Sequence, residues 1–132
     1  MRAKGYEIQL AEQQAQLAGF NTHFDVWFSE LSLHDSGSVP ETLARLKELG
    51  HVFEQDGALW MRTTDFGDDK DRVLIKSDGE LTYFASDTAY YLNKRARGFE
   101  HCIYLLGADH HGYVGRLRAM AACVGDDPDQ TL

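Results

Sequence analysis

The 132-residue sequence predicts an α/β fold, half of a doubly wound unit with inserted β-hairpins, on three observations. Residues 101–106, HCIYLL, form a nearly continuous apolar run of strand length, as in a parallel sheet covered on both faces. Apolar residues recur at helical spacing before and after that run. Two Asp-Gly pairs between residues 51 and 83 separate short strand-like stretches, which is typical of β-hairpins. Helix, strand and helix in that order make half of a doubly wound α/β unit.

About the first 23 residues are predicted to be a helical lead-in. They are rich in Gln, Ala and Glu, carry a weak apolar stripe, and reach a helix-ending glycine at Gly19. The following sequence, FDVWFSE, places Phe24, Val26 and Phe28 on one side of an alternating pattern. This alternation predicts a short strand, and its large residues on both sides predict burial on two faces.

The next helix is predicted to begin at Ser38. Ser38 and Glu41 stand in the S-x-x-E relation of a capping box, and Pro40 lies in the first turn. Apolar residues then recur at helical spacing until Gly50, where the helix is expected to end.

Two β-hairpins are predicted after this helix. HVFE pairs with ALWMRTT around Asp56-Gly57, and RVLIKS pairs with ELTYF around Asp78-Gly79. The charged segment DFGDDKD lies between the hairpins. It lacks the glycine and glutamate positions of a calcium loop, and no kinase glycine-rich loop precedes it, so a solvated loop is expected.

The turn after residues 101–106 is the first candidate site, because ligands bind at the carboxyl ends of strands in open α/β sheets. Gly107 would admit a ligand to the backbone, and Asp109 could accept hydrogen bonds from a ribose. His110 and His111 could contact a base or phosphate. The spacing fits equally well a turn in which Asp109 caps the next helix and both histidines are exposed. Adjacent histidines rarely bind one ion, so no metal site is predicted.

Tyr83 and Asp87 form the second candidate site. Tyr83 is expected at the end of a strand and Asp87 at the start of a helix running to Gly98, so both polar groups could face one pocket. A carboxylate held ionised by the helix dipole suits a cationic ligand such as a guanidinium. Taken alone, these residues favour a structural interpretation, with Asp87 stabilising the first helical turn and Tyr83 an aromatic at the sheet edge.

Composition argues against nucleic-acid and membrane partners and favours a cytoplasmic location. A net charge of −8 argues against binding nucleic acid through phosphate contacts alone, and the short basic stretch NKRARG at residues 93–98 is expected to be a solvated helix face. Without a secretory segment, Cys102 and Cys123 are predicted to be buried reduced thiols of a cytoplasmic protein. No apolar run approaches the roughly 20 residues needed to cross a bilayer, so no membrane partner is expected.

Three strings, FDVWFSE, DGALWMRTTDFGDDKDRVLIKSDGELTYFASDTAYY and GADHHGYVGRLRA, together resemble arginyl-tRNA synthetase of the bacterial type, a class I aminoacyl-tRNA synthetase. They run from about Phe24 to the C-terminus in one order, which is far more specific than a short motif. The resemblance implies that residues 1–132 are a fragment of a Rossmann-type catalytic domain. Residues 24–132 would be its Rossmann-type portion, with a hairpin region over residues 51–83.

The family activates arginine with ATP and Mg²⁺ to arginyl-adenylate and transfers the arginyl group to tRNA(Arg). Its Y-x-x-x-D element falls on Tyr83 and Asp87, which implies contact with the arginine side chain. Its G-x-D segment after the strand implies an adenylate site, with the neighbouring histidines lining the same pocket. The residues implied to bind ATP or adenylate are Gly107, Asp109, His110 and His111.

The family's H-I-G-H and K-M-S-K-S elements are missing from these 132 residues. No catalytic residue is therefore assigned, and the chain is expected to be an internal piece that is inactive alone. Arginine, ATP and tRNA(Arg) are the partners implied for the longer enzyme. Two alternatives remain: a non-catalytic module that binds arginine or nucleotide, and a piece that self-associates through uncovered sheet edges and apolar faces.

Overall fold

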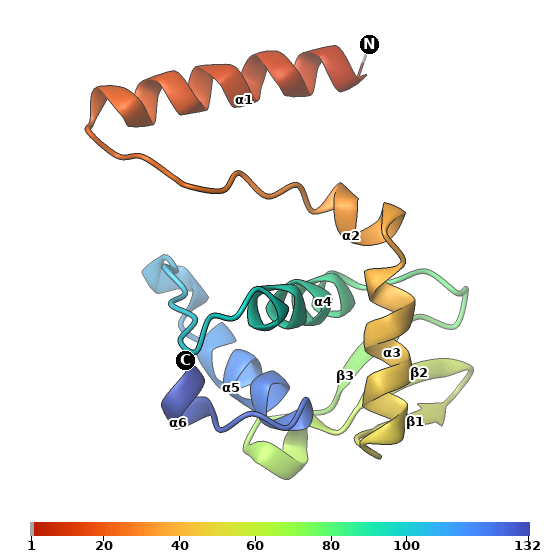
Figure 1. Cartoon of the computed structure of the whole chain (residues 1–132). Helices are drawn as coiled ribbons and strands as arrows, with labels where there is room; N and C mark the ends of the chain where they lie inside the picture. Colours follow the sequence, from red (N-terminus) through yellow and green to blue (C-terminus); the bar gives the residue numbers. More distant parts are fainter. Residues whose placement is uncertain (1) are drawn as a thin grey trace.

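Helix α1 (Arg2–Gly19) stands apart from the rest of the chain in a computed structural model that describes residues 2–132 (Figure 1). The predicted helix ending at Gly19 is confirmed. Nearly all of its described side chains are exposed, including Tyr6 and Ile8. The weak apolar stripe of α1 explains this exposure, because the helix has little apolar surface to bury against the rest of the protein. The division of the chain into a helical lead-in over about residues 1–23 and a Rossmann-type portion over residues 24–132 stays a prediction.

The strand predicted over residues 24–30 is wrong. Residues 22–29 have no regular secondary structure, and the described chain brings no neighbouring strand to them. Phe24 and Val26 are consequently 54% and 57% exposed. Phe28, in contrast, stacks on the body, with its ring centroid 4.5 Å from that of Tyr90. An alternating pattern makes a strand only where a partner strand supplies hydrogen bonds.

Helices α2 (Leu31–Asp35) and α3 (Ser38–Glu48) follow, and the capping box predicted for α3 is wrong. Gly37 is the N-cap residue, in the left-handed region with φ 75°, and no side chain caps the helix. Ser38 is the first helical residue, and its hydroxyl is 2.6 Å from that of Ser36. Only two residues join α2 to α3, and the sharp turn requires the conformational freedom of glycine.

The sheet contains three short antiparallel strands in the order β1 (Val52–Gln55), β2 (Ala58–Met61), β3 (Arg72–Ile75). The first predicted hairpin is confirmed. Asp56 and Gly57 have φ of 53° and 75°, which is the pair of left-handed residues that a type I′ turn requires.

The second predicted hairpin is reduced to a single bridge between Ile75 and Leu81. Thr82 ends the pairing because it is the N-cap of helix α4 (Tyr83–Ala96), and its hydroxyl accepts a hydrogen bond from the amide of Ala85. Tyr83 therefore begins a helix and does not end a strand. The helix predicted from residue 86 starts three residues earlier than expected.

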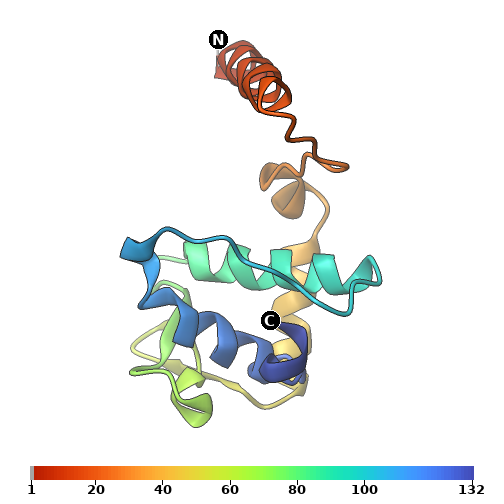
Figure 2. The same cartoon turned by 90° about the vertical axis from the view of Figure 1, so that its left-hand side faces the viewer.

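The strand predicted at residues 101–106 is also wrong, since residues 101–107 have no regular structure and no parallel strand pairs with them in the described chain. Strand-like alternation persists nonetheless. Cys102 is buried, whereas Ile103 and Leu105 are 84% and 95% exposed. Figure 2 shows this segment crossing the body beside α4 before the chain turns into α5 (Tyr113–Cys123).

The core lies where α3, α4, α5 and the sheet meet, and α6 (Pro128–Thr131) closes its end (Figure 1). Both cysteines are buried free thiols, as predicted. None of the helices described between residues 2 and 132 combines the length and apolar character needed to cross a membrane. The largest apolar side chains of the core that are fully buried are Leu46, Met61, Leu74, Tyr91 and Met120.

The loop between β2 and β3 is less solvated than predicted. It starts with a 3-10 turn (Thr63–Phe66), and the side chain of Asp68 is only 4% exposed. Arg72 on β3 donates two hydrogen bonds of 2.7 Å to the Asp68 carboxylate. These bonds hold the pKa of Asp68 well below its usual range. The ion pair thus fixes the loop to the sheet.

Asp68→Asn should weaken this attachment and flatten the acid dependence of stability. The pKa of Asp68 is lower in the folded chain than in the unfolded chain, so the ion pair stabilises the fold fully above about pH 4, the ordinary pKa of an aspartate. This stabilisation is lost as the pH falls from about 4 through the lowered pKa of the folded state. At pH 7 the variant should lose about 2 kcal/mol of unfolding free energy, measured by urea denaturation. Between pH 6 and pH 3 it should lose less further stability than the wild type.

The matched control is Asp69→Asn, because Asp69 contacts the same arginine but its side chain is 77% exposed. Its effect should be much smaller at every pH. Equal effects of the two substitutions would contradict a special role for the buried pair.

Candidate functional site

A cavity of about 270 Å³, here called the Asp87 pocket, opens between α4, residues 104–106 and the start of α5. Asp87 of the predicted arginine site and His110 of the predicted adenylate site both line this cavity. The lining is otherwise apolar or aromatic. Its residues are Asp87, Tyr104, Leu106, His110, Tyr113 and Leu117.

Asp87 lies one turn inside α4, not in its first turn as predicted. The helix dipole acts mainly on the first turn, so the surrounding contacts are more important for this carboxylate. The hydroxyl of Tyr113, the first residue of α5, donates a close hydrogen bond to Asp87 Oδ2. This bond spans the gap between the two helices and orients the half-buried carboxylate.

Burial, and after it the hydrogen bond to Asp87, together raise the pKa of Tyr113 to about 12. The phenol is therefore a protonated donor at neutral pH. The guanidinium of Arg116 lies over the ring, 4.6 Å from its centroid, and adds a cation–π contact.

Tyr83 lies at the first position of α4 and is 87% exposed. A separation of four residues places it on the same side of the helix as Asp87, one turn away. It does not line the Asp87 pocket. The two residues therefore share one helix, and the predicted arrangement across a strand-to-helix bend is wrong.

The turn that begins at Gly107 contains a 3-10 turn (Ala108–His110) and is exposed throughout. The carboxylate of Asp109 folds back over Gly107, where an added Cβ would lie 2.5 Å from Asp109 Oδ1. Asp109 is also 3.8 Å from Nε2 of His110, an ion pair when that histidine is protonated. The alternative in which Asp109 caps α5 is wrong, because Gly112 is the N-cap residue and no side chain caps the helix.

Comparison with known proteins shows the family of this chain. Residues 5–132 match the model of the family described as tRNA synthetases class I (R), catalytic domain. The chain belongs to this family. The arginine–tRNA ligases of Paenarthrobacter aurescens and Renibacterium salmoninarum are 60% and 61% identical over all 132 residues. The chain spans about a quarter of their length, 24% in each case.

Solved structures of the family have the same fold. A Campylobacter jejuni protein named as an arginyl-tRNA synthetase is 37% identical, with a TM-score of 0.89 over 95% of this chain and 27% of its own. Thermus thermophilus arginyl-tRNA synthetase is 23% identical, with a TM-score of 0.72 over 98% of this chain and 29% of its own, and shows the fold alone. The helices and small antiparallel sheet are thus part of the class I synthetase catalytic fold.

Sequence reasoning missed two aromatic residues of the Asp87 pocket, Tyr104 and Tyr113. Tyr104 is half-buried and contacts the amine of Lys94, which lies 4.1 Å from the ring centroids of both Tyr104 and Tyr90. The burial of the Lys94 amine lowers its pKa. The basic stretch at residues 93–98 is therefore not simply the solvated face that was predicted. Tyr113 could have been noticed because it immediately follows the candidate turn.

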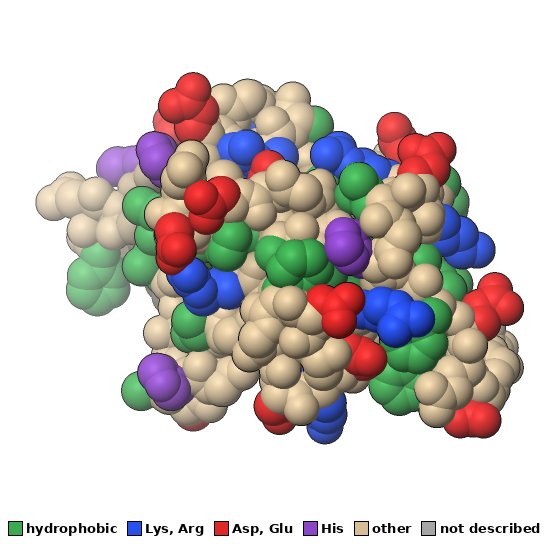
Figure 3. All heavy atoms as spheres, turned by 90° about the horizontal axis from the view of Figure 1, so that it is seen from below, with side chains coloured by type: hydrophobic (Ala, Val, Ile, Leu, Met, Phe, Trp, Pro, Cys, Tyr) green, Lys and Arg blue, Asp and Glu red, His purple; other side chains and the backbone are tan. Residues whose placement is uncertain are grey.

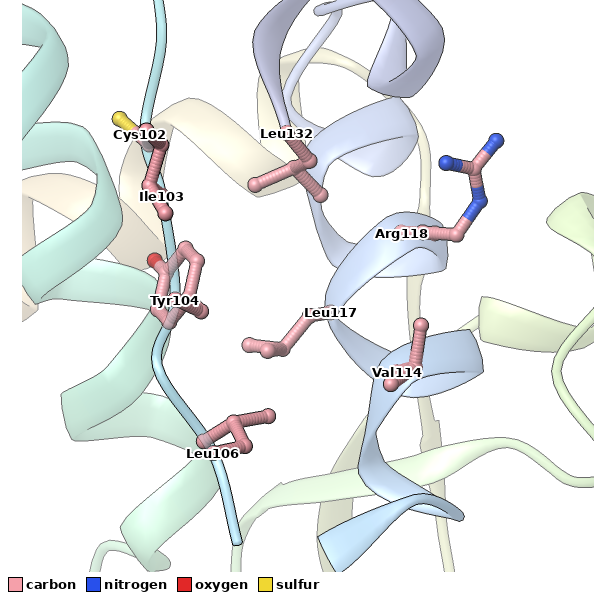
Figure 4. A pocket seen from close by; sticks show the side chains of 8 residues that line it. All are labelled: Cys102, Ile103, Tyr104, Leu106, Val114, Leu117, Arg118 and Leu132. Carbon is pink, nitrogen blue, oxygen red and sulfur yellow. The ribbon is translucent and has the colours of Figure 1, made fainter. Parts of the chain in front are cut away.

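A second cavity of about 270 Å³ adjoins the first and is lined almost entirely by apolar side chains (Figure 4). Leu117 and Leu132 point toward the segment that carries Ile103 and Leu106, while the head of Arg118 points away from it (Figure 4). Such a lining suits apolar packing better than a nucleotide or an amino acid.

Charge is mixed on the underside of the molecule. Figure 3 shows basic and acidic side chains interspersed there, and the described residues form no continuous basic surface on that face. That face therefore lacks the concentrated positive charge on which phosphate-backbone contacts depend.

Asp87→Asn should lower the pKa of Tyr113, because it replaces a charged hydrogen-bond acceptor with a weaker, neutral amide and removes a nearby negative charge. The pKa should fall from about 12 toward the ordinary value but stay above it, since burial remains. An alkaline titration of the tyrosine Cζ resonances by NMR would measure it, with Tyr113→Phe to assign the signal.

Asp126→Asn is the matched control. Asp126 accepts a 2.6 Å hydrogen bond from Tyr91, whose pKa is also raised to about 12. This substitution should move the Tyr91 resonance and leave Tyr113 unchanged. A Tyr113 pKa that does not respond to Asp87→Asn would show that the hydrogen bond is absent in solution.

Proposed function

We propose that this chain supplies the arginine-binding side of the active site of an arginine–tRNA ligase. The observation that supports the proposal most strongly is the Asp87 pocket, in which a carboxylate and His110 line one small cavity. In the longer enzyme, arginine and ATP would give arginyl-adenylate and pyrophosphate, and the arginyl group would then pass to tRNA(Arg). The relatives' names support this reaction.

Asp87 is the proposed partner of the arginine guanidinium. A carboxylate and a guanidinium can form two parallel charge-assisted hydrogen bonds, and partial burial strengthens such a pair relative to water. The apolar walls of the pocket suit the methylene groups of the arginine side chain. Tyr83, one turn away on the same helix, would contact arginine only from the rim.

The adenylate would occupy the neighbouring exposed turn. Gly107 and Asp109 would lie against the ribose or the amino-acid moiety, and His110 and His111 would line the same site. The exposure of all four residues supports this role, because their polar groups are available to a ligand.

Mg²⁺ would enter with the phosphates of ATP, since this ion is usually held through substrate phosphates and few carboxylates. Between residues 4 and 132 the described side chains include no group of three or more His, Cys, Asp or Glu residues that could hold a metal ion. The residues present therefore do not form a metal site of their own, and no step of the reaction is assigned to one.

Self-association is the second candidate function. The exposed side chains of Ile103 and Leu105 lie on an extended segment with which no strand of residues 2–132 pairs, and this favours pairing with another chain. Arginine binding would not depend on such pairing, because the Asp87 pocket is formed within one chain.

The chain should bind arginine and discriminate against citrulline, its neutral near-isostere. An amide NMR titration should show saturable shifts around Asp87 with arginine alone. Asp87→Asn should weaken binding roughly tenfold or more, because a charge-assisted pair becomes a neutral contact. Asp126→Asn removes one negative charge beside the same helix and should leave arginine affinity unchanged. A folded wild-type spectrum with no response to arginine would rule out a preformed pocket.

The chain alone should not catalyse arginine-dependent exchange between pyrophosphate and ATP. Attack at the α-phosphate requires positioned cationic groups, and the H-I-G-H and K-M-S-K-S elements that supply them in the family are not in this sequence. A full-length arginine–tRNA ligase assayed alongside is the positive control. Exchange by the purified chain above the arginine-free blank would contradict this expectation.

A further inference from the structure

Tyr113 connects the two halves of the proposed site. It follows Gly112 directly, so it lies at the end of the turn that begins at Gly107. Its hydroxyl donates a hydrogen bond to Asp87 on α4, 26 residues away in sequence. One side-chain bond therefore joins the turn of the adenylate half to the helix of the arginine half.

The geometry of a carboxylate gives this bond a consequence for guanidinium binding. A carboxylate has two oxygens with about four lone-pair positions, of which Tyr113 occupies one at Oδ2 of Asp87. Oδ1 and one position at Oδ2 remain, which is what a guanidinium needs for two parallel hydrogen bonds. Between residues 4 and 132 no other side chain hydrogen-bonds the Asp87 carboxylate. Without Tyr113 the carboxylate would be free to rotate.

Tyr113 is itself held firmly enough to orient a partner. Its ring is half-buried in the wall of the Asp87 pocket and lies under the guanidinium of Arg116. Helix α5, which starts at Tyr113, is anchored in the core by buried residues such as Leu117 and Met120. The hydroxyl therefore acts from a fixed backbone position.

We propose that Tyr113 is a positioning residue for arginine, whose hydroxyl holds the Asp87 carboxylate in the plane that a guanidinium requires. This inference rests on the proposed function and adds a residue that determines specificity. Orientation matters for a planar guanidinium, which binds through a rigid fork, and matters little for an ammonium, which is a point charge. Tyr113 thus favours arginine over lysine through the orientation of Asp87.

Tyr113→Phe is the test, with arginine and lysine as the two probes and isothermal titration calorimetry as the measurement. Arginine should bind about tenfold more weakly, as expected on losing a hydrogen bond to a charged group. Lysine affinity should change less than about twofold, so the preference for arginine should fall by nearly the same factor. A purely structural role would weaken both ligands together and leave the preference unchanged.

Tyr91→Phe is the matched control, because it also removes a tyrosine hydroxyl that donates to an aspartate, Asp126, but outside the pocket. It should leave both affinities unchanged. If wild type binds arginine and Tyr113→Phe binds it equally well, the positioning role is overturned while the proposed function stands. If the wild type itself does not bind arginine, both are overturned.

A measurement on the unmodified chain covers the case in which Tyr113→Phe does not fold. Bound arginine places a positive charge beside Asp87, so saturating arginine should lower the pKa of the Tyr113 phenol. The tyrosine Cζ titration with and without arginine would detect this shift. A Tyr113 resonance that arginine does not affect would overturn the inference.

Discussion

The burial of α4 is the constraint on which the site depends. Tyr91 is fully buried in the middle of this helix, and its hydroxyl bonds to Asp126 at 2.6 Å. Arg95, one turn further, pairs with the same carboxylate at 2.9 Å. These contacts fix α4 to the turn between α5 and α6. Asp87 precedes Tyr91 by one turn on the same side of the helix, so the burial of the Tyr91 ring, rather than its hydroxyl, fixes the position from which Asp87 faces its pocket.

Aromatic and cationic side chains extend this constraint toward the N-terminal segment. Phe28 stacks on Tyr90, and the amine of Lys94 lies between Tyr90 and Tyr104. Tyr104 in turn forms part of the pocket wall. These four side chains therefore form a continuous series of contacts from the segment before α2 to the proposed ligand site. Phe28 belongs to the string FDVWFSE, so a residue of the family pattern contributes to the site without lining it.

Local features were predictable from the sequence and long-range pairing was not. The hairpin at Asp56-Gly57 forms because two left-handed residues specify its turn wherever the chain lies. The strands predicted at residues 24–30 and 101–106 required hydrogen-bonding partners that no local pattern can reveal. In the site, charge and spacing made Asp87 and His110 candidates, although only the family resemblance implied a ligand-binding role for Asp87. Tyr113 did not, because an aromatic residue at a helix start has the same appearance in a core as beside a ligand.

Because α1 is isolated, it should unfold by a different process from the body of the molecule. Most of the described side chains of α1 are exposed, so little tertiary packing adds to its helical hydrogen bonds and its amides should exchange with solvent by fraying of a single helix. Amides in α4 are protected by a buried core and should exchange only when that core opens. Heating should therefore melt α1 gradually and the body cooperatively. A probe of total helicity would then record two processes, whereas a probe of Tyr91 would record only the second.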